Sequence, residues 1–270
     1  MSDIIFKQPP LVEVVAELRW DVPTTGEVPE QFAGVPLPVR DSSAYEIQFM
    51  NFAGKAGAKG FGLVERVIPP GFPLMARQVA YRYRKATGAE GAPLFQLGPG
   101  VFTVNLVPPY KSWRGFLPHI ELGLEMLLES MTENNRIDAF TEVRLRYIDV
   151  FGENLRQGRP AINFLEEGLG ISVKLPPSLT QYCTDHNQSK LNLSVSLPID
   201  QGNMDLNIGE RWVRNTRSLV METVVTRKGP IHSDKNNILD SFTDAHRIIH
   251  DSFVAMTEPL HKFMEPVSED

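Results

Sequence analysis

The stretch "LVEVVAELRW" (11–20) indicates the fold, because it has a close counterpart in "TEVRLRYIDV" (141–150). Apolar and polar side chains alternate in both stretches, as they do in a strand with one buried face. Aligning Val143 with Ala16 superimposes the apolar and the charged positions of the two stretches. We interpret them as the opening strands of two related halves.

The elements that follow have the same order in both halves. Turn-rich sequence runs from the first strand to about Gly60 and includes a short predicted strand at 45–50. The first half continues with strands at 62–68, 78–85, 94–97 and 101–107 and a helix at 113–131. The second half has strands at 140–150, 191–197, 204–208 and 219–227, a short helix at 162–168 and a long helix from Asp234.

Runs of strands followed by a helix predict an α+β fold, in which each long C-terminal helix packs on one face of an antiparallel sheet. We expect a tandem pseudo-duplication with halves at 1–133 and 134–270, and one continuous domain is the alternative. The layout is similar to helix-grip and TATA-binding-protein-like folds. The other interpretation is a single irregular α+β domain whose two strands are alike by accident.

Four motifs carry a family resemblance: "PPLVEVV" (9–15), "LGPGVFTVN" (97–105), "PYKSWRGF" (109–116) and "LRYIDV" (145–150). In combination they resemble a sporadically distributed bacterial family of uncharacterised proteins of about this length. The resemblance covers the first 150 residues and, beyond them, only the order of strands and helix. It implies a shared fold and transfers no catalytic residue, and the sporadic distribution implies an accessory or defence role.

Composition restricts the class of protein. With 42% hydrophobic and 22% charged residues, the chain is typical of a globular protein in water. The net charge of −6 argues against a protein that coats nucleic acid or an anionic membrane. The single cysteine allows no internal disulfide. Because no apolar stretch has the length of a signal peptide or a membrane span, we expect the protein in the cytoplasm.

The strongest recognition motif is "RQVAYRYRK" (77–85), which contains four cations and no acid. On a strand, its two central arginines share one face and its two tyrosines share the other. Arginines beside aromatic rings suit phosphate contact and base stacking. The candidates for ligand or anion binding are therefore Arg77, Tyr81, Arg82, Tyr83 and Arg84. The alternative is cross-strand ion pairing, for instance with Glu13 or Glu17.

Two further aromatic residues, Tyr110 and Trp113, lie where the predicted sheet leads into the helix at 113–131. Aromatic residues at such a junction generally hold the helix start against the sheet. Contact with a ligand is the second interpretation. In "LGPG" (97–100), proline flanked by glycines predicts a tight turn between two strands.

Other stretches give weaker signals for chemistry. "GKAGAKGFG" (54–62) lacks the spacing of a phosphate-binding loop, so we expect a flexible loop there. His246 and His250 have the i, i+4 spacing of a metal-binding pair, but Arg247 replaces the glutamate of the metalloprotease signature. We favour hydrogen-bonded histidines and expect no metal and no cofactor. Cys183 lies near Asp185 and His186, and an ordinary cysteine is favoured there over a nucleophile.

No complete catalytic constellation is evident in the sequence, so we lean against an enzyme. We expect a non-catalytic binding or scaffold protein that associates with a protein partner or with itself. The alternative is a protein that binds a small molecule in the cleft between sheet and helix. Nucleic-acid binding and an unrecognised enzyme are less favoured.

Overall fold

The computed structural model describes residues 4–26, 36–85, 92–110, 112–182, 184 and 190–268. Within these residues the fold is α+β, with a large antiparallel sheet and seven α-helices. The helices are α1 (Ser42–Ala58), α2 (Trp113–Ser130), α3 (Glu153–Arg156), α4 (Ala161–Leu169), α5 (Pro177–Thr180), α6 (Lys235–Met256) and α7 (His261–Met264). Short 3-10 turns occur at Glu133–Asn135 (η2) and Glu258–Leu260 (η4).

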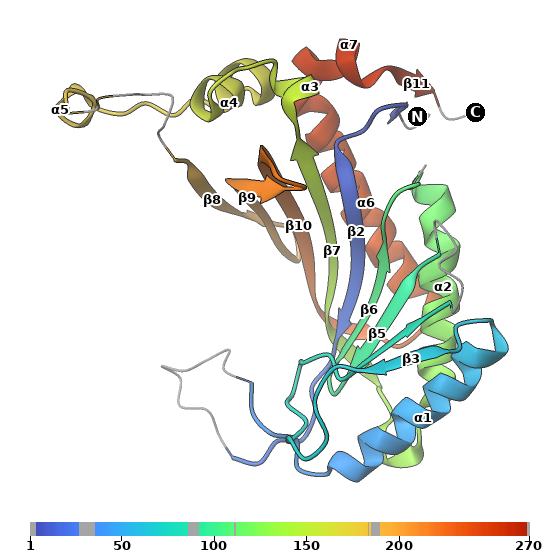
Figure 1. Ribbon diagram of the computed structural model, residues 1–270. Helices are drawn as coiled ribbons and strands as arrows, with labels where there is room; N and C mark the ends of the chain where they lie inside the picture. Colours follow the sequence, from blue (N-terminus) through green and yellow to red (C-terminus); the bar gives the residue numbers. More distant parts are fainter. Residues whose placement is uncertain are drawn as a thin grey trace. The chain divides into compact units, whose positions relative to one another are not determined.

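The described strands form two sheets. A small sheet joins β1 (Ile4–Phe6) to β11 (Pro266–Ser268). The large sheet has the strand order β3-β4-β5-β6-β2-β7-β10-β9-β8 (Figure 1). Its strands are β2 (Leu11–Arg19), β3 (Leu63–Arg66), β4 (Tyr81–Arg84), β5 (Leu94–Gly98), β6 (Val101–Leu106), β7 (Ala139–Phe151), β8 (Asn192–Ile199), β9 (Gly202–Val213) and β10 (Thr216–His232).

The chain divides into two compact units. The first unit comprises Met1–Glu13, Arg146–Val225 and His246–Asp270, and the second comprises Val14–Leu145 and Thr226–Ala245. Strands β2, β7 and β10 and helix α6 each contribute residues to both units. This grouping by spatial proximity does not test the sequence halves at 1–133 and 134–270, which stay a prediction.

The second unit has an aromatic core between its strands and helices α1 and α2. Phe52 of α1 contacts the rings of Tyr83, Phe95 and Phe102, with centroid distances of 4.7, 6.4 and 5.7 Å. Gly123 lets α2 approach this layer closely, because a Cβ there would lie 2.8 Å from the ring of Phe95. Burial of several aromatic rings supplies a large part of the hydrophobic stabilisation of such a core.

The first unit has its own hydrophobic core. Side chains of β9 and β10 pack there against α4 and the C-terminal residues of the chain. The largest fully buried rings are Phe151 at the end of β7 and Phe164 of α4, whose centroids are 5.4 Å apart. Alternate residues of β9 and β10, namely Leu206, Ile208, Leu219 and Met221, face this core. The period of two is the pattern expected for strands with one buried face.

The predicted turn "LGPG" connects β5 to β6, as the sequence indicated. Gly100 has a φ of 75°, a value that glycine adopts readily. Gly98 has no room for a side chain, because a Cβ would lie 1.9 Å from the main-chain oxygen of Gln78. The register that follows from the turn pairs Leu97 with Phe102 and Gln96 with Thr103.

The passage before Gly60 differs from its prediction. The expected strand at 45–50 is wrong, and the expected loop at 54–62 is wrong as far as Ala58, because α1 extends from Ser42 to Ala58. Asp41 caps this helix by accepting hydrogen bonds from the main-chain nitrogens of Ser43 and Ala44 at 3.0 and 3.4 Å. Its buried face carries Tyr45, Phe49, Phe52 and Ala56 at intervals of a helical turn.

The two predicted long helices form. Ser112 caps α2, and its hydroxyl accepts a hydrogen bond from the main-chain nitrogen of Gly115 at 3.4 Å. Asp234 caps α6, which ends at Met256 although the apolar stripe of the sequence continues to Phe263.

In the described part of the chain, no helix combines the length and apolar character that a membrane crossing requires.

Candidate functional site

A row of polar side chains crosses the sheet of the second unit. We call Glu65, Arg82, Gln96, Thr103, Glu17 and Arg144 the polar row. From β3 to β2, each member lies opposite the next in the strand register. Arg144 of β7 joins the row because its Nη1 donates to Oε1 of Glu17 at 3.0 Å.

The polar row lies on the face of the sheet opposite α1. On β4, Tyr83 packs against α1, and its hydroxyl donates to the main-chain oxygen of Phe49 at 3.1 Å. Because successive side chains point to opposite faces of a strand, Arg82 points away from α1. In the same way Gln96 alternates with the buried Phe95. On β4 and β5 the sequence alternation therefore places aromatic rings on the face towards α1 and polar side chains on the other face.

The centre of this polar face holds a cluster of two arginines and two glutamates. Oε1 of Glu17 accepts hydrogen bonds from Nε of Arg19 at 2.6 Å and from Nη1 of Arg144 at 3.0 Å. Nη1 of Arg19 also lies 3.6 Å from Oε2 of Glu142. Only 8% of the Glu17 surface is exposed. A carboxylate so well buried keeps its charge at low cost only when cations accompany it, as the two arginines do here.

Between this cluster and the sheet edge, amide and hydroxyl groups form a small network. Nε2 of Gln96 donates to Oγ1 of Thr103 at 3.1 Å and to Oδ1 of Asn105 at 3.0 Å. The Thr103 hydroxyl donates to the same Asn105 oxygen at 2.7 Å. These hydrogen bonds fix the side chains on the sheet surface, which reduces the entropy lost when another molecule binds to them.

The two central arginines of the sequence motif reach the polar face at its outer strands. Nε of Arg82 donates to Oε1 of Gln96 at 3.1 Å, and Arg84 pairs with Glu65 of β3. The two arginines thus pair with residues of adjacent strands and not with Glu13 or Glu17, the partners suggested from the sequence. Arg82 and Arg84 therefore share one face, as expected.

The tyrosines of the motif lie on the opposite face and do not join the arginines. The Tyr81 hydroxyl donates to Oε2 of Glu46 at 3.0 Å and accepts a hydrogen bond from Nη1 of Arg66 at 3.1 Å. Burial, followed by the contact with Glu46, raises the pKa of Tyr81. Burial also raises the pKa of Tyr83. Arg77 lies outside β4, and its Nη2 donates to Oδ1 of Asp21 at 3.2 Å.

Tyr110 and Trp113 lie at the start of α2, where they contact the helix. Their rings lie 6.2 and 5.9 Å from the ring of Phe116, which is fully buried. Trp113 is 7% exposed. This geometry favours the packing interpretation of the two aromatic residues over contact with a ligand.

His246 and His250 lie side by side on α6, with ring centroids 5.4 Å apart. Nδ1 of His246 is 2.9 Å from the Tyr147 hydroxyl, and the two rings stack. In the described residues, no group of three or more His, Cys, Asp or Glu side chains is placed to hold a metal ion. The geometry therefore favours a hydrogen-bonded His246. Cys183, Asp185 and His186 lie outside the described residues.

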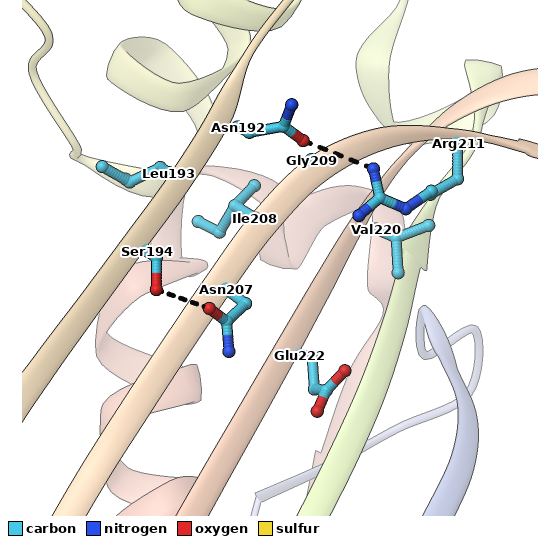
Figure 2. Close-up of a pocket in the computed structure, with 9 residues that line it drawn as sticks. All are labelled: Asn192, Leu193, Ser194, Asn207, Ile208, Gly209, Arg211, Val220 and Glu222. Carbon is cyan, nitrogen blue, oxygen red and sulfur yellow. Dashed lines mark hydrogen bonds between the residues drawn. The ribbon is translucent and has the colours of Figure 1, made fainter. Parts of the chain in front are cut away.

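The first unit contains a pocket of about 410 Å³ on strands β8, β9 and β10 (Figure 2). Its polar lining includes Ser194, whose hydroxyl donates to Oδ1 of Asn207 at 2.7 Å. Nη1 of Arg211 donates to Oδ1 of Asn192 at 3.3 Å. Gly209 lies beneath this bond, since a Cβ there would be 2.6 Å from the Asn192 oxygen.

A carboxylate completes the lining of this pocket. Glu222 of β10 points from the same face as Asn207 (Figure 2). Its Oε1 lies 3.5 Å from Nε of Arg146. Amide, hydroxyl, guanidinium and carboxylate groups thus surround a space large enough for a small polar molecule.

Sequence reasoning missed most of the residues that these two sites bring together. A signal for Gln96 and Thr103 was present, because a two-residue turn at Pro99 and Gly100 sets them opposite each other. Glu17 was considered only as an ion-pair partner of the motif arginines, and no comparable signal indicated Arg144, whose strand is distant in the chain. The pocket residues Asn192 and Asn207 alternate with apolar neighbours, which predicted strands but no site.

Comparisons with known proteins add little to this geometry. No family model matches the chain. No curated protein matches it either. Among solved structures, a rolling circle replication initiator protein from Geobacillus stearothermophilus matches with 10% sequence identity and a TM-score of 0.25, over 93% of this chain and 85% of that chain. A similarity this low supports no conclusion about function.

Proposed function

We propose that this is a cytoplasmic, non-catalytic binding protein that uses the polar face of the second unit to bind a protein partner. The observation that carries the proposal is the polar row, which crosses strands β3, β4, β5, β6, β2 and β7 on the face opposite α1. Polar groups already fixed by mutual hydrogen bonds favour recognition of a partner with complementary groups.

The charges of the polar face favour a protein over a nucleic acid. Its described arginines are Arg19, Arg82, Arg84 and Arg144, and its described glutamates are Glu17, Glu65 and Glu142. Nucleic-acid binding depends on a large excess of cations that neutralise phosphates, whereas the described cations of this face exceed its described carboxylates by one. Ion pairs of both signs instead suit a protein surface that also carries both signs.

Isolation of the protein from its own host tests this proposal. Native mass spectrometry before and after denaturation should detect a protein companion in a fixed ratio to the chain. Retention on heparin should be weak and should change little with salt, because few phosphate contacts form. A nucleic-acid companion, or strong salt-dependent retention on heparin, would contradict the proposal.

A second candidate function is the binding of a small polar molecule, favoured by the pocket of about 410 Å³ on β8, β9 and β10. This site differs from the cleft between sheet and helix that the sequence suggested. In the same mass measurement, a small mass lost on denaturation would favour this function. Gly209→Val should then reduce the amount of that molecule, because its side chain would fill the floor of the pocket.

We also propose that the chain arose by tandem duplication and has a TATA-binding-protein-like arrangement. Support comes from the strand order, in which the opening strands β2 and β7 are neighbours. In the large sheet, the last strand of each half, β6 or β10, follows on the outer side of its opening strand. The resemblance to a sporadically distributed bacterial family adds an accessory or defence role to this proposal.

A further inference from the structure

The outer edge of β8 is a strand edge without charge protection. β8 is the last strand in the order of the large sheet, and β9 is its partner within the described chain. An edge strand presents unpaired N–H and C=O groups that can pair with another strand, so proteins commonly protect it with charges, bulges or proline. The sequence of β8, NLSVSLPI, contains no charged residue, and its proline is Pro198 near the end.

The opposite edge of the large sheet is protected. β3 has four residues, and two of them are charged. Nη2 of Arg66 lies 2.8 Å from Oε1 of Glu46, and Glu65 pairs with Arg84. A second strand would have to pair beside these charges on a short segment. The two edges of the sheet therefore differ in length and in charge.

The faces of β8 are suited to pairing with an identical strand. Leu193 packs against the hydrophobic core of the first unit, and Val195 and Leu197 follow it on the same face. Half of the Leu197 surface is exposed, at 50%. Ser194 and Ser196 lie on the other face, where they donate hydrogen bonds to β9.

We propose that β8 pairs antiparallel with β8 of a second copy of this chain, about a two-fold axis at Val195. In this register Leu193 lies opposite Leu197, Val195 opposite Val195, and Ser194 opposite Ser196. Apolar residues thus meet apolar residues on one face, and hydroxyls meet hydroxyls on the other. A shift of one residue would turn the apolar face of the second copy to the polar side, so the hydrophobic pattern excludes that register.

The uncharged strand allows two acidic chains to approach each other. Each copy has a net charge of −6, which opposes association in general. Along β8 no charges of like sign come together, because the strand contributes none. This dimer uses the first unit alone and does not depend on the partner proposed for the polar face.

The mass of the purified full-length protein tests the dimer. Sedimentation velocity at micromolar concentration should give twice the mass of one chain for the wild type. Leu197→Lys should give a monomer, because it places a charged side chain opposite Leu193 of the second copy. Leu63→Lys is the matched control, since Leu63 is 46% exposed on the other edge strand and its variant should stay dimeric. A monomeric wild type, or a dimeric Leu197→Lys variant, would overturn the proposal.

A cross-linking experiment tests the register without relying on the stability of the Leu197→Lys variant. In a Cys183→Ser background, Val195→Cys places identical residues opposite each other at the axis, where Cβ atoms lie about 4.5–5.5 Å apart. Mild oxidation should produce a covalent dimer from this variant. Val64→Cys on β3 should remain monomeric under denaturing conditions. Failure of Val195→Cys to cross-link, or equal cross-linking by both variants, would contradict the pairing at β8.

Discussion

At the scale of single residues, the space around position 98 accommodates glycine and no larger residue. A Cβ at this position would lie 1.9 Å from the main-chain oxygen of Gln78 and cannot be accommodated without movement of the backbone. We predict that Gly98→Ala lowers the free energy of unfolding by about 2 kcal/mol or more, in the range of overpacked sites. Gly62→Ala is the control, because no atom lies within 4 Å of its Cβ, and its effect should be within about 0.5 kcal/mol. Urea denaturation measures both, and equal effects would contradict this account.

Asp149 makes stability depend on pH. Burial raises the pKa of this carboxyl from 3.8 to about 8, so the folded state binds its proton more tightly than the unfolded state does. Its contribution to stability is therefore highest below the unfolded pKa and falls as the pH rises towards the folded pKa. Each unit of pKa difference corresponds to about 1.4 kcal/mol.

We predict that Asp149→Asn is more stable than the wild type at about pH 8, and that the difference decreases towards about pH 5, because the amide needs no proton to stay neutral. Urea denaturation at several pH values measures the difference. Parallel stability curves for the two proteins would show that Asp149 is not the responsible group.

At the scale of elements, α1 shows where sequence patterns were insufficient. Its glycines, Gly54 and Gly57, and its proximity to a turn-rich passage indicated a loop. A helical signal was nevertheless present in Asp41 as a cap and in aromatic residues spaced by three and four positions. Tertiary packing against Tyr83 and α2 stabilises a helix that local propensity alone makes weak.

We predict that Asp41→Ala lowers the urea midpoint of unfolding, because two main-chain N–H groups of α1 lose their acceptor. Asp41→Asn should retain most of the stability, since its amide oxygen accepts the same bonds. Hydrogen bonds from the Ser43 hydroxyl and from the main chain lower the pKa of Asp41, so its carboxylate contributes above the unfolded pKa of 3.8 and loses this contribution in acid. An unchanged midpoint for Asp41→Ala would contradict the capping role.

The elements with strong periodicity were predictable. Both long helices and the strands around the turn at Gly98 occur where the sequence placed them, because apolar spacing and turn residues act locally. The pairing of β1 with β11 and the position of β2 beside β6 depend on contacts between distant parts of the chain. The tyrosines and arginines of β4 separated as predicted, but the acidic partners of the arginines could not be identified without the strand order.

At the scale of the whole molecule, the polar face is the feature that the proposed binding function explains. A chain with a net charge of −6 holds several arginines on one sheet face, each beside a carboxylate or an amide. The exposed pair of Arg84 with Glu65 contributes little to stability, because exposed ion pairs are typically worth about 0–1 kcal/mol. Recognition explains the place of this pair on the polar face better than stability of the fold does, whereas the buried Glu17 needs Arg19 and Arg144 beside it.

The claim that the polar face is the binding surface is tested most directly by the affinity of two charge-reversal variants for the protein companion. Arg82→Glu with Arg84→Glu changes the polar face, and Lys55→Glu with Lys59→Glu makes the same change in charge at the C-terminal end of α1. With the companion purified from the host, we predict that the first variant loses affinity by at least about tenfold, which corresponds to about 1.4 kcal/mol. The second variant should bind like the wild type. Equal affinities for the two variants, with both proteins folded, would contradict the assignment of the polar face as the binding surface.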